Sequence, residues 1–219
     1  MDTVCSQTGD EVLATFFTRY PDMLQCETAV RVARSTVTTA FGSGHKLMVC
    51  GNGGSAADSE HVVGELMKSF RFKRPVPEDF KVAYRKANGE DAPEWLEGAL
   101  PAISLVSQTA LSTAFGNDEA SVGTFAQQVL GYGQTGDVLL AISTSGNSAN
   151  VVEAAKVARA LGVKVISFTG ANDSKLTPLS DVCVRVPRTE VFQVQELHLP
   201  VYHCLCAAAE ADLFGGAQQ

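Results

Sequence analysis

The sequence predicts an α/β fold in which helices cover both faces of a five-stranded parallel sheet. Three observations support this prediction. Five short runs of strand length, at residues 46–50, 101–105, 137–142, 163–168 and 181–186, alternate with longer segments of helical periodicity. Residues 138–142 are apolar without interruption, as expected for a central strand buried on both faces. Turns rich in glycine and serine follow the first and third runs, at the sheet edge where ligands bind.

Before the first strand, residues 10–43 are predicted to form two helices. Pro21 separates the two helices, and a Gly-Ser-Gly sequence at residues 42–44 ends the second. An N-terminal arm of this kind packs either against a second subunit or against its own chain, and the sequence leaves both arrangements open. Its apolar faces are expected to contain Phe16, Phe17, Tyr20, Met23, Val30, Val32, Ala33, Val37 and Phe41.

A helix is predicted from Ser55 to about residue 70, with Val62, Val63, Leu66 and Met67 facing inward. Residues 76–100 differ from their surroundings because they are polar, rich in charges and interrupted by prolines. They contain too few apolar residues for a core, so we interpret them as an inserted excursion with short helical pieces. Residues 1–219 are therefore assigned to a single domain.

Helices are also predicted in the second half of the chain, at about residues 122–132, 149–161 and 191–213. The polar flanks of residues 181–186 predict an edge strand there. With these elements the alternation of strands and helices extends to the end of the chain.

The composition limits the classes of function. The 219 residues carry a formal net charge of -7, which argues against nucleic acid as a main partner because such binding needs a basic face. No apolar run has the length of a membrane span, and the first residues lack the basic start of a signal peptide. The six cysteines follow neither a disulfide nor a zinc-finger spacing. We therefore expect reduced, buried thiols and a cytoplasmic location.

The first glycine-rich turn is a candidate anion site. Residues 49–61 have the sequence VCGNGGSAADSEH, in which a strand turns through glycines into a helix. Such a turn brings free backbone N–H groups and the positive end of a helix dipole to one point, which favours phosphate. Ser55 is expected to cap the helix and to donate to a phosphate oxygen.

The second turn, STSGNS at residues 143–148, follows the third strand. The hydroxyl groups of Ser143, Thr144, Ser145 and Ser148 can hold a phosphate without any lysine. The alternative interpretation is an ordinary helix N-cap with serines in the preceding turn.

Two pairs of polar residues form a candidate metal site. His61 and Glu65 are four residues apart and share a helix face. Gln195 and His203 are eight residues apart on the last predicted helix, also roughly on one face. These groups could bind one divalent metal, with zinc the most natural ion for two histidines. On spacing alone, packed or solvated histidines are the more common alternative.

Taken together, these motifs resemble the sugar isomerase (SIS) family. The resemblance rests on CGNGGS with Asp58, His61 and Glu65 at fixed spacing, and on the Gly-Asn-Asp sequence at residues 116–118. It also rests on ISTSGNS at residues 142–148 and on QELH at residues 195–198 followed by His203. The most similar branch is the sedoheptulose 7-phosphate isomerases, also called phosphoheptose isomerases. The resemblance implies a flavodoxin-like three-layer sandwich, a homotetramer with sites between subunits, and one zinc ion per subunit.

The resemblance also implies a role for each site residue. Glu65 and His203 would form the catalytic acid–base pair of a ketose/aldose isomerase. The reaction would convert sedoheptulose 7-phosphate to D-glycero-D-manno-heptose 7-phosphate through an enediol, with zinc assistance. The implied zinc ligands are His61, Glu65, Gln195 and His203. The implied substrate-binding residues are Asn52, Gly53, Gly54, Ser55, Glu65, Asn117, Asp118, Ser143, Thr144, Ser145, Ser148 and Gln195.

Two alternatives stay open. The same chemistry could act on another sugar phosphate, or the chain could be a non-catalytic binding protein. The DnaA initiator-associating proteins are similar to this chain in fold and serine-rich turns, but they lack a histidine at the position of His203. The presence of all four expected ligands favours the enzyme.

Overall fold

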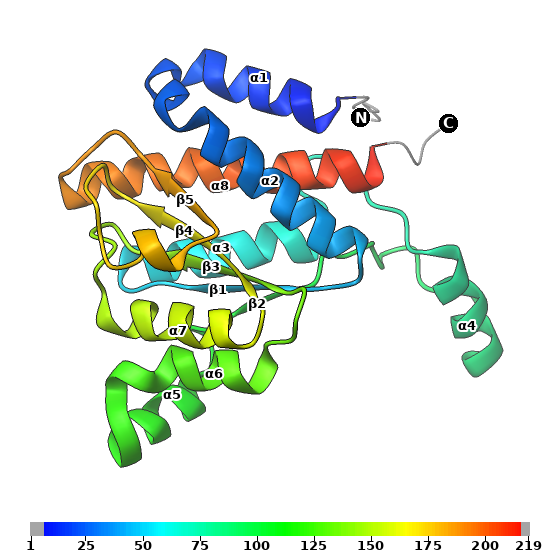
Figure 1. The fold of residues 1–219 in the computed structure, drawn as a ribbon. Coiled ribbons are helices and arrows are strands. Elements are labelled where there is room, and N and C mark those ends of the chain that lie inside the picture. Colours follow the sequence, from blue (N-terminus) through cyan, green and yellow to red (C-terminus); the bar gives the residue numbers. More distant parts are fainter. Residues whose placement is uncertain (1–6, 216–219) are drawn as a thin grey trace.

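The predicted five-stranded parallel sheet forms the centre of the computed structural model, which describes residues 7–215 (Figure 1). Its strands are β1 (Leu47–Cys50), β2 (Ala102–Ser104), β3 (Val138–Ile142), β4 (Lys164–Thr169) and β5 (Val182–Arg185). Their order is β2-β1-β3-β4-β5, and every neighbouring pair is parallel. This is the flavodoxin-like strand order. In such a sheet the ligand site lies between β1 and β3, where the order of the strands reverses. β5 lies at an edge, as the sequence predicts.

Helices cover both faces of the sheet (Figure 1). On one face lie α2 (Glu27–Gly42), α3 (Gly54–Met67) and α8 (Val191–Phe214), with α1 (Gly9–Arg19) packed against α8. On the other face lie α6 (Thr124–Tyr132) and α7 (Ala149–Ala160). The side chains of β1 alternate between the two cores, because successive residues of a strand point to opposite sides. Within residues 7–215, no helix combines the length and apolar character that a membrane crossing needs.

The N-terminal arm packs on its own chain. Pro21 opens a 3-10 helix, Pro21–Cys26, that turns the chain from α1 into α2. Phe16, Phe17 and Met23 are buried in the core that α8 shares. Packing of the arm within its own chain is therefore present, and a contact of the arm with a second subunit stays a prediction. Val32 departs from the predicted apolar face, since it is 46% exposed.

The excursion contains one helix rather than several short pieces. This helix, α4 (Glu78–Asn88), has no buried residue and projects away from the sheet (Figure 1). Gly89 ends it in the left-handed conformation, with φ of 76°, which glycine adopts without strain. Trp95, which follows in the same segment, is 76% exposed.

The helix α3 confirms most of its predicted face but not all of it. Val62 and Leu66 are buried in the core, and Val63 is half-buried. Met67 was predicted to face inward, and this was wrong, because its side chain is 47% exposed. One helical step rotates a side chain by about 100°, so Met67 lies off the stripe that Leu66 occupies.

The segment between β2 and α6 is irregular. The short helix α5 (Thr109–Phe115) continues into a π-helical turn, Gly116–Ala120, and a 3-10 turn, Ser121–Gly123. A further 3-10 turn, Thr177–Leu179, precedes β5.

The cysteines that the structure describes are free thiols. Four of them, Cys26, Cys50, Cys204 and Cys206, are buried. Burial raises the pKa of Cys26 to about 11 and that of Cys50 to about 12, which keeps both thiols protonated. These residues confirm the expectation of buried, reduced thiols, while Cys5 lies outside the described residues.

Candidate active site

The two turns predicted to hold phosphate lie side by side. Because β1 and β3 are neighbours, their carboxyl ends bring residues 51–54 and 143–148 to the same edge of the sheet. Asn52 in the first turn and Asn150 at the start of α7 exchange two amide hydrogen bonds, of 2.8 and 2.9 Å. The two turns therefore lie next to each other at the switch point, where the sequence places them.

The first turn needs its glycines. Gly53 has φ of 58°, in the left-handed region that other residues rarely adopt. Gly54 is the first residue of α3, and a Cβ there would lie 2.0 Å from Nε2 of Gln195. The predicted role of Ser55 as helix cap was wrong, because Gly53 occupies the cap position and Ser55 is already inside the helix. Ser55 N–H also donates to the Asn52 carbonyl oxygen at 3.0 Å, so it is not free for an anion.

The second turn exposes hydroxyl groups that the helix does not use. Ser148 is the N-cap residue of α7, yet its side chain makes no capping hydrogen bond. Instead its Oγ lies 3.0 Å from Oγ of the buried Ser143. Ser145 is exposed, and its Oγ accepts from the N–H of Asn147 at 3.2 Å. Thr144 is half-buried between them. The hydroxyls of Ser143 and Ser148 are thus paired with each other rather than with the helix, and a phosphate would have to replace this contact to bind them.

Asn117 and Asp118 lie elsewhere on the surface, in the π-helical turn after α5. The Asn117 amide donates to the Asp118 carboxylate at 2.8 Å, and both side chains are exposed. Among the described residues, the side chains of Asn117 and Asp118 hydrogen-bond to each other and not to the two turns at residues 51–54 and 143–148. Their predicted contact with the sugar stays a prediction.

Three of the four predicted metal ligands meet between α3 and α8. The ring nitrogen Nε2 of His61 lies 3.2 Å from Oε1 of Glu65 and 3.5 Å from Nε2 of His203. Lys68 pairs with the other Glu65 oxygen, at 3.0 Å. Burial lowers the pKa of His203, and the neighbouring His61 lowers it further. His203 is therefore neutral near pH 7. A neutral imidazole and a carboxylate side by side are suited to accepting and returning protons.

On the inner side of this cluster, the Tyr202 hydroxyl lies 3.0 Å from Nδ1 of His61 and donates to Oδ1 of Asp58 at 3.2 Å. Tyr202 is 1% exposed. Burial, and then the proximity of Asp58, raise the pKa of the Tyr202 hydroxyl. Burial likewise raises the pKa of Asp58 above its ordinary value.

The chemical types of these donor groups fit zinc, but their present positions fit it less well. Two imidazoles and a carboxylate are typical zinc ligands, and donors about 2.0–2.1 Å from a tetrahedral zinc lie about 3.3 Å apart. The distances from His61 to Glu65 and to His203 are close to that value. Within residues 7–215, however, no three such side chains are already arranged to hold a metal ion. Gln195 lies against Gly54, about 12 Å along α8 from His203 by helical rise.

The sequence is similar to known proteins over most of its length. The SIS domain family model matches residues 97–170. The phosphoheptose isomerase of Rhodospirillum rubrum is 40% identical over 185 residues, which cover 84% of this chain and 86% of that protein. The chain belongs to the phosphoheptose isomerase family. The phosphoheptose isomerase of Akkermansia muciniphila is 35% identical and covers 82% of each chain. The family predicted from the motifs is thus confirmed.

Solved structures of the same family share the fold. The chain is similar to the phosphoheptose isomerase GmhA of Neisseria gonorrhoeae, with a TM-score of 0.69 and 30% identity. That match covers 92% of this chain and 98% of the other. The phosphoheptose isomerase of Francisella tularensis gives a TM-score of 0.72 at 29% identity, over 91% of this chain and 96% of that one.

A buried ion pair holds the helix end that carries Glu65. Nε of Arg74 lies 2.8 Å from Oε1 of Glu210, and both side chains are 0% exposed. The Arg74 guanidinium also donates to the carbonyl oxygens of Leu66, at 2.5 Å, and Glu65, at 3.0 Å. Two carbonyl groups in the last turn of α3 therefore accept hydrogen bonds from this side chain.

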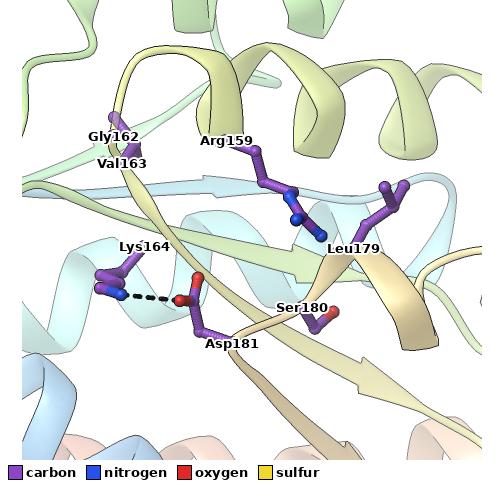
Figure 2. A pocket seen from close by; sticks show the side chains of 7 residues that line it. All are labelled: Arg159, Gly162, Val163, Lys164, Leu179, Ser180 and Asp181. Atoms are coloured by element: carbon purple, nitrogen blue, oxygen red, sulfur yellow. Dashed lines mark hydrogen bonds and ion pairs between the residues drawn. The ribbon is translucent and has the colours of Figure 1, made fainter.

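A separate cavity lies at the other end of the strands, where β4 and β5 begin. It has a volume of about 290 Å³ and is lined by residues around the starts of β4 and β5, including Arg159, Lys164 and Asp181 (Figure 2). Lys164 pairs with Asp181 at 2.8 Å (Figure 2). Because ligands of such sheets bind at the carboxyl ends of strands, we do not assign the substrate to this cavity.

Sequence reasoning missed four residues that contact the candidate site in the structure. Asn150 lies two residues after the serine-rich turn. An amide side chain at a helix start, beside a turn predicted to bind phosphate, could have indicated its place at the candidate site. Lys68 lies three residues after Glu65, at the spacing of a helical ion pair. Tyr202 adjoins His203 but resembles an ordinary core residue. Arg74 gave no signal, because its partner Glu210 is 136 residues away.

Proposed function

We propose that this chain is an isomerase that converts sedoheptulose 7-phosphate to D-glycero-D-manno-heptose 7-phosphate through an enediol. One observation carries the proposal. In a member of the phosphoheptose isomerase family, His61, Glu65 and His203 come together at the face formed by α3 and α8. The α3 helix starts at the turn beside the serine motif, so the same elements bear the acid–base groups and the candidate phosphate site.

The two turns supply the phosphate site in this proposal. The hydroxyls of Ser143 and Ser148 would donate to phosphate oxygens in place of their present mutual contact. Thr144, Ser145 and Ser55 would complete the polar surface around the phosphate. Asn52 is held in place by Asn150 and would face the sugar. No lysine is needed, because hydroxyl and N–H groups suffice for a phosphate at helix starts.

The acid–base groups carry the proton transfers. Glu65 would remove the proton from C1 of the ketose, and its carboxylate is oriented for this by contacts with His61 and Lys68. His203, with its pKa lowered by burial, would move a proton at the sugar oxygens while the enediol forms and collapses. The enediolate charge must be stabilised for either step to be fast.

We further propose that His61, Glu65, Gln195 and His203 bind one zinc ion. The imidazole and carboxylate donors support this proposal, as does the spacing of His61 from its two neighbours. Bound zinc supplies Lewis-acid polarisation of the sugar oxygens.

A homotetramer with sites between subunits is proposed as well. Phe192 and Leu199 lie on the same face of α8 as His203, and they are 60% and 41% exposed. Met67, at the end of α3, is 47% exposed. An apolar stripe beside acid–base groups favours cover by a second copy of the chain. Light scattering on the purified protein tests the number of copies.

A turnover assay tests the function. Purified protein is mixed with sedoheptulose 7-phosphate, with and without a chelator, and the sugar phosphates are followed by NMR. Formation of a heptose 7-phosphate that stops with chelator supports both the reaction and the metal. No turnover with zinc supplied favours another sugar phosphate or a non-catalytic binding protein.

A further inference from the structure

A short hydrogen-bond chain lies behind His61, on the side away from Glu65 and His203. Nδ1 of His61 is 3.0 Å from the Tyr202 hydroxyl, and that hydroxyl donates to Oδ1 of Asp58 at 3.2 Å. The aromatic rings of Tyr202 and His61 also contact each other edge to face, with centroids 5.5 Å apart. Tyr202 is buried and Asp58 nearly so, which leaves this chain of groups little room to rearrange.

The number of protons in this chain fixes their positions. A tyrosine hydroxyl carries one proton, and that proton points to Asp58. The Tyr202 oxygen can therefore only accept from His61, so the His61 proton must lie on Nδ1. Oδ2 of Asp58 has no hydrogen-bond partner among residues 7–215, so Tyr202 is the group that holds this carboxyl.

In the neutral His61 ring the opposite nitrogen is then unprotonated. Nε2 directs a lone pair toward Oε1 of Glu65, 3.2 Å away, and toward Nε2 of His203, 3.5 Å away. An unprotonated Nε2 can bind a cation that lies among these three groups. An imidazole that donates through one nitrogen and ligates through the other is the usual state of a metal-binding histidine.

We propose that Tyr202, held by Asp58, is a positioning residue that keeps the His61 proton on Nδ1 and so leaves Nε2 free to bind a metal. The metal in this statement is the zinc of the proposed function, on which the inference rests. Tyr202 itself touches neither the metal nor the sugar. It acts through the orientation and tautomer of the His61 ring.

The tautomer can be measured without any metal. The chain has four histidines, so ¹⁵N-labelling of histidine gives few ring signals, and His61→Gln identifies those of His61. Spectra of the metal-free protein at pH 8, above the ordinary histidine pKa of about 6.5, report which ring nitrogen carries the proton. Wild type is compared with Tyr202→Phe, which removes only the hydroxyl. Tyr132→Phe, at an exposed position on α6, is the matched control.

We expect the His61 proton on Nδ1 in wild type and in Tyr132→Phe, and mainly on Nε2 in Tyr202→Phe. Zinc affinity, measured by competition with a chromogenic chelator, should fall about 10–100-fold in Tyr202→Phe, the usual cost of losing such a partner. A wild-type His61 with its proton on Nε2, or ring signals unchanged in Tyr202→Phe, overturns the proposal. A wild type that binds no zinc counts against the proposed function, while the ring signals still decide the role of Tyr202.

Discussion

Replacing Arg74 by methionine should destabilise the protein strongly, because Arg74 is the partner of a buried charge. The Glu210 carboxylate is 0% exposed and receives Arg74 Nε together with the N–H groups of Phe70 and Arg71, each at 2.8 Å. In Arg74→Met the two N–H groups remain, but the balancing charge is lost. The Glu65 carbonyl oxygen loses the Arg74 donor as well, while that of Leu66 keeps the N–H of Leu100 at 2.9 Å.

The magnitude follows from the cost of removing one partner of a buried ion pair, about 3–5 kcal/mol. With a urea slope of about 2.5 kcal/mol per molar for a chain of this size, a loss of about 4 kcal/mol lowers the unfolding midpoint by about 1.6 M. Urea titration followed by circular dichroism measures this shift. Protein concentration is held constant, because assembly makes apparent stability depend on it.

The matched control is Arg85→Met on α4. Arg85 pairs with Asp91, but both side chains are largely exposed, at 70% and 74%. Exposed pairs contribute about 0–1 kcal/mol, so the midpoint should move by less than about 0.4 M. If Arg74→Met loses no more stability than Arg85→Met, the reasoning from burial and charge is refuted.

Three further predictions concern the site and the pH dependence. His203→Ala should lower kcat at least about 100-fold while the far-UV spectrum stays the same, and retained turnover would remove His203 from the mechanism. Ser143→Ala should raise KM for the sugar phosphate about tenfold, since a hydrogen bond to a charged group contributes about 1.5–3 kcal/mol; an unchanged KM would contradict the phosphate assignment. Burial lowers the pKa of His198 to about 4 from its ordinary 6.5. The unfolded chain therefore binds a proton that the folded one does not, and stability should fall by about 3 kcal/mol as pH drops from about 6.5 to 4. His198→Gln should flatten that part of a urea-midpoint profile measured against pH, and an equally steep profile would contradict the assignment to His198.

The strands and their parallel sheet could be expected from the sequence because hydrophobic periodicity is a local signal, whereas the flavodoxin-like fold was implied only by the family resemblance. Residues 138–142 are apolar and became the fully buried β3. The glycines at 53 and 54 predicted a tight turn into a helix, and the structure has one there. Local patterns of this kind depend on backbone sterics and on the spacing of apolar residues, and both can be read from neighbouring positions in the sequence.

The finer arrangement of the site depends on contacts between distant residues. Helical spacing put Gln195 and His203 on one face, but it could not show that the Gln195 side chain lies against Gly54. The cap role given to Ser55 failed because the cap residue is Gly53, two positions earlier than expected. The hydrogen bond from Tyr202 to Asp58 joins residues 144 positions apart, and no local pattern reports it.

Isomerisation of sedoheptulose 7-phosphate in deuterated water tests the proposed reaction and its enediol intermediate together. Passage through an enediol lets the acid–base groups exchange the transferred proton with solvent before it returns to C2. We expect the zinc-supplied protein to form a heptose 7-phosphate that carries deuterium at C2, and His203→Ala to form none. Substrate that stays unchanged with wild-type protein and zinc would contradict the proposed function.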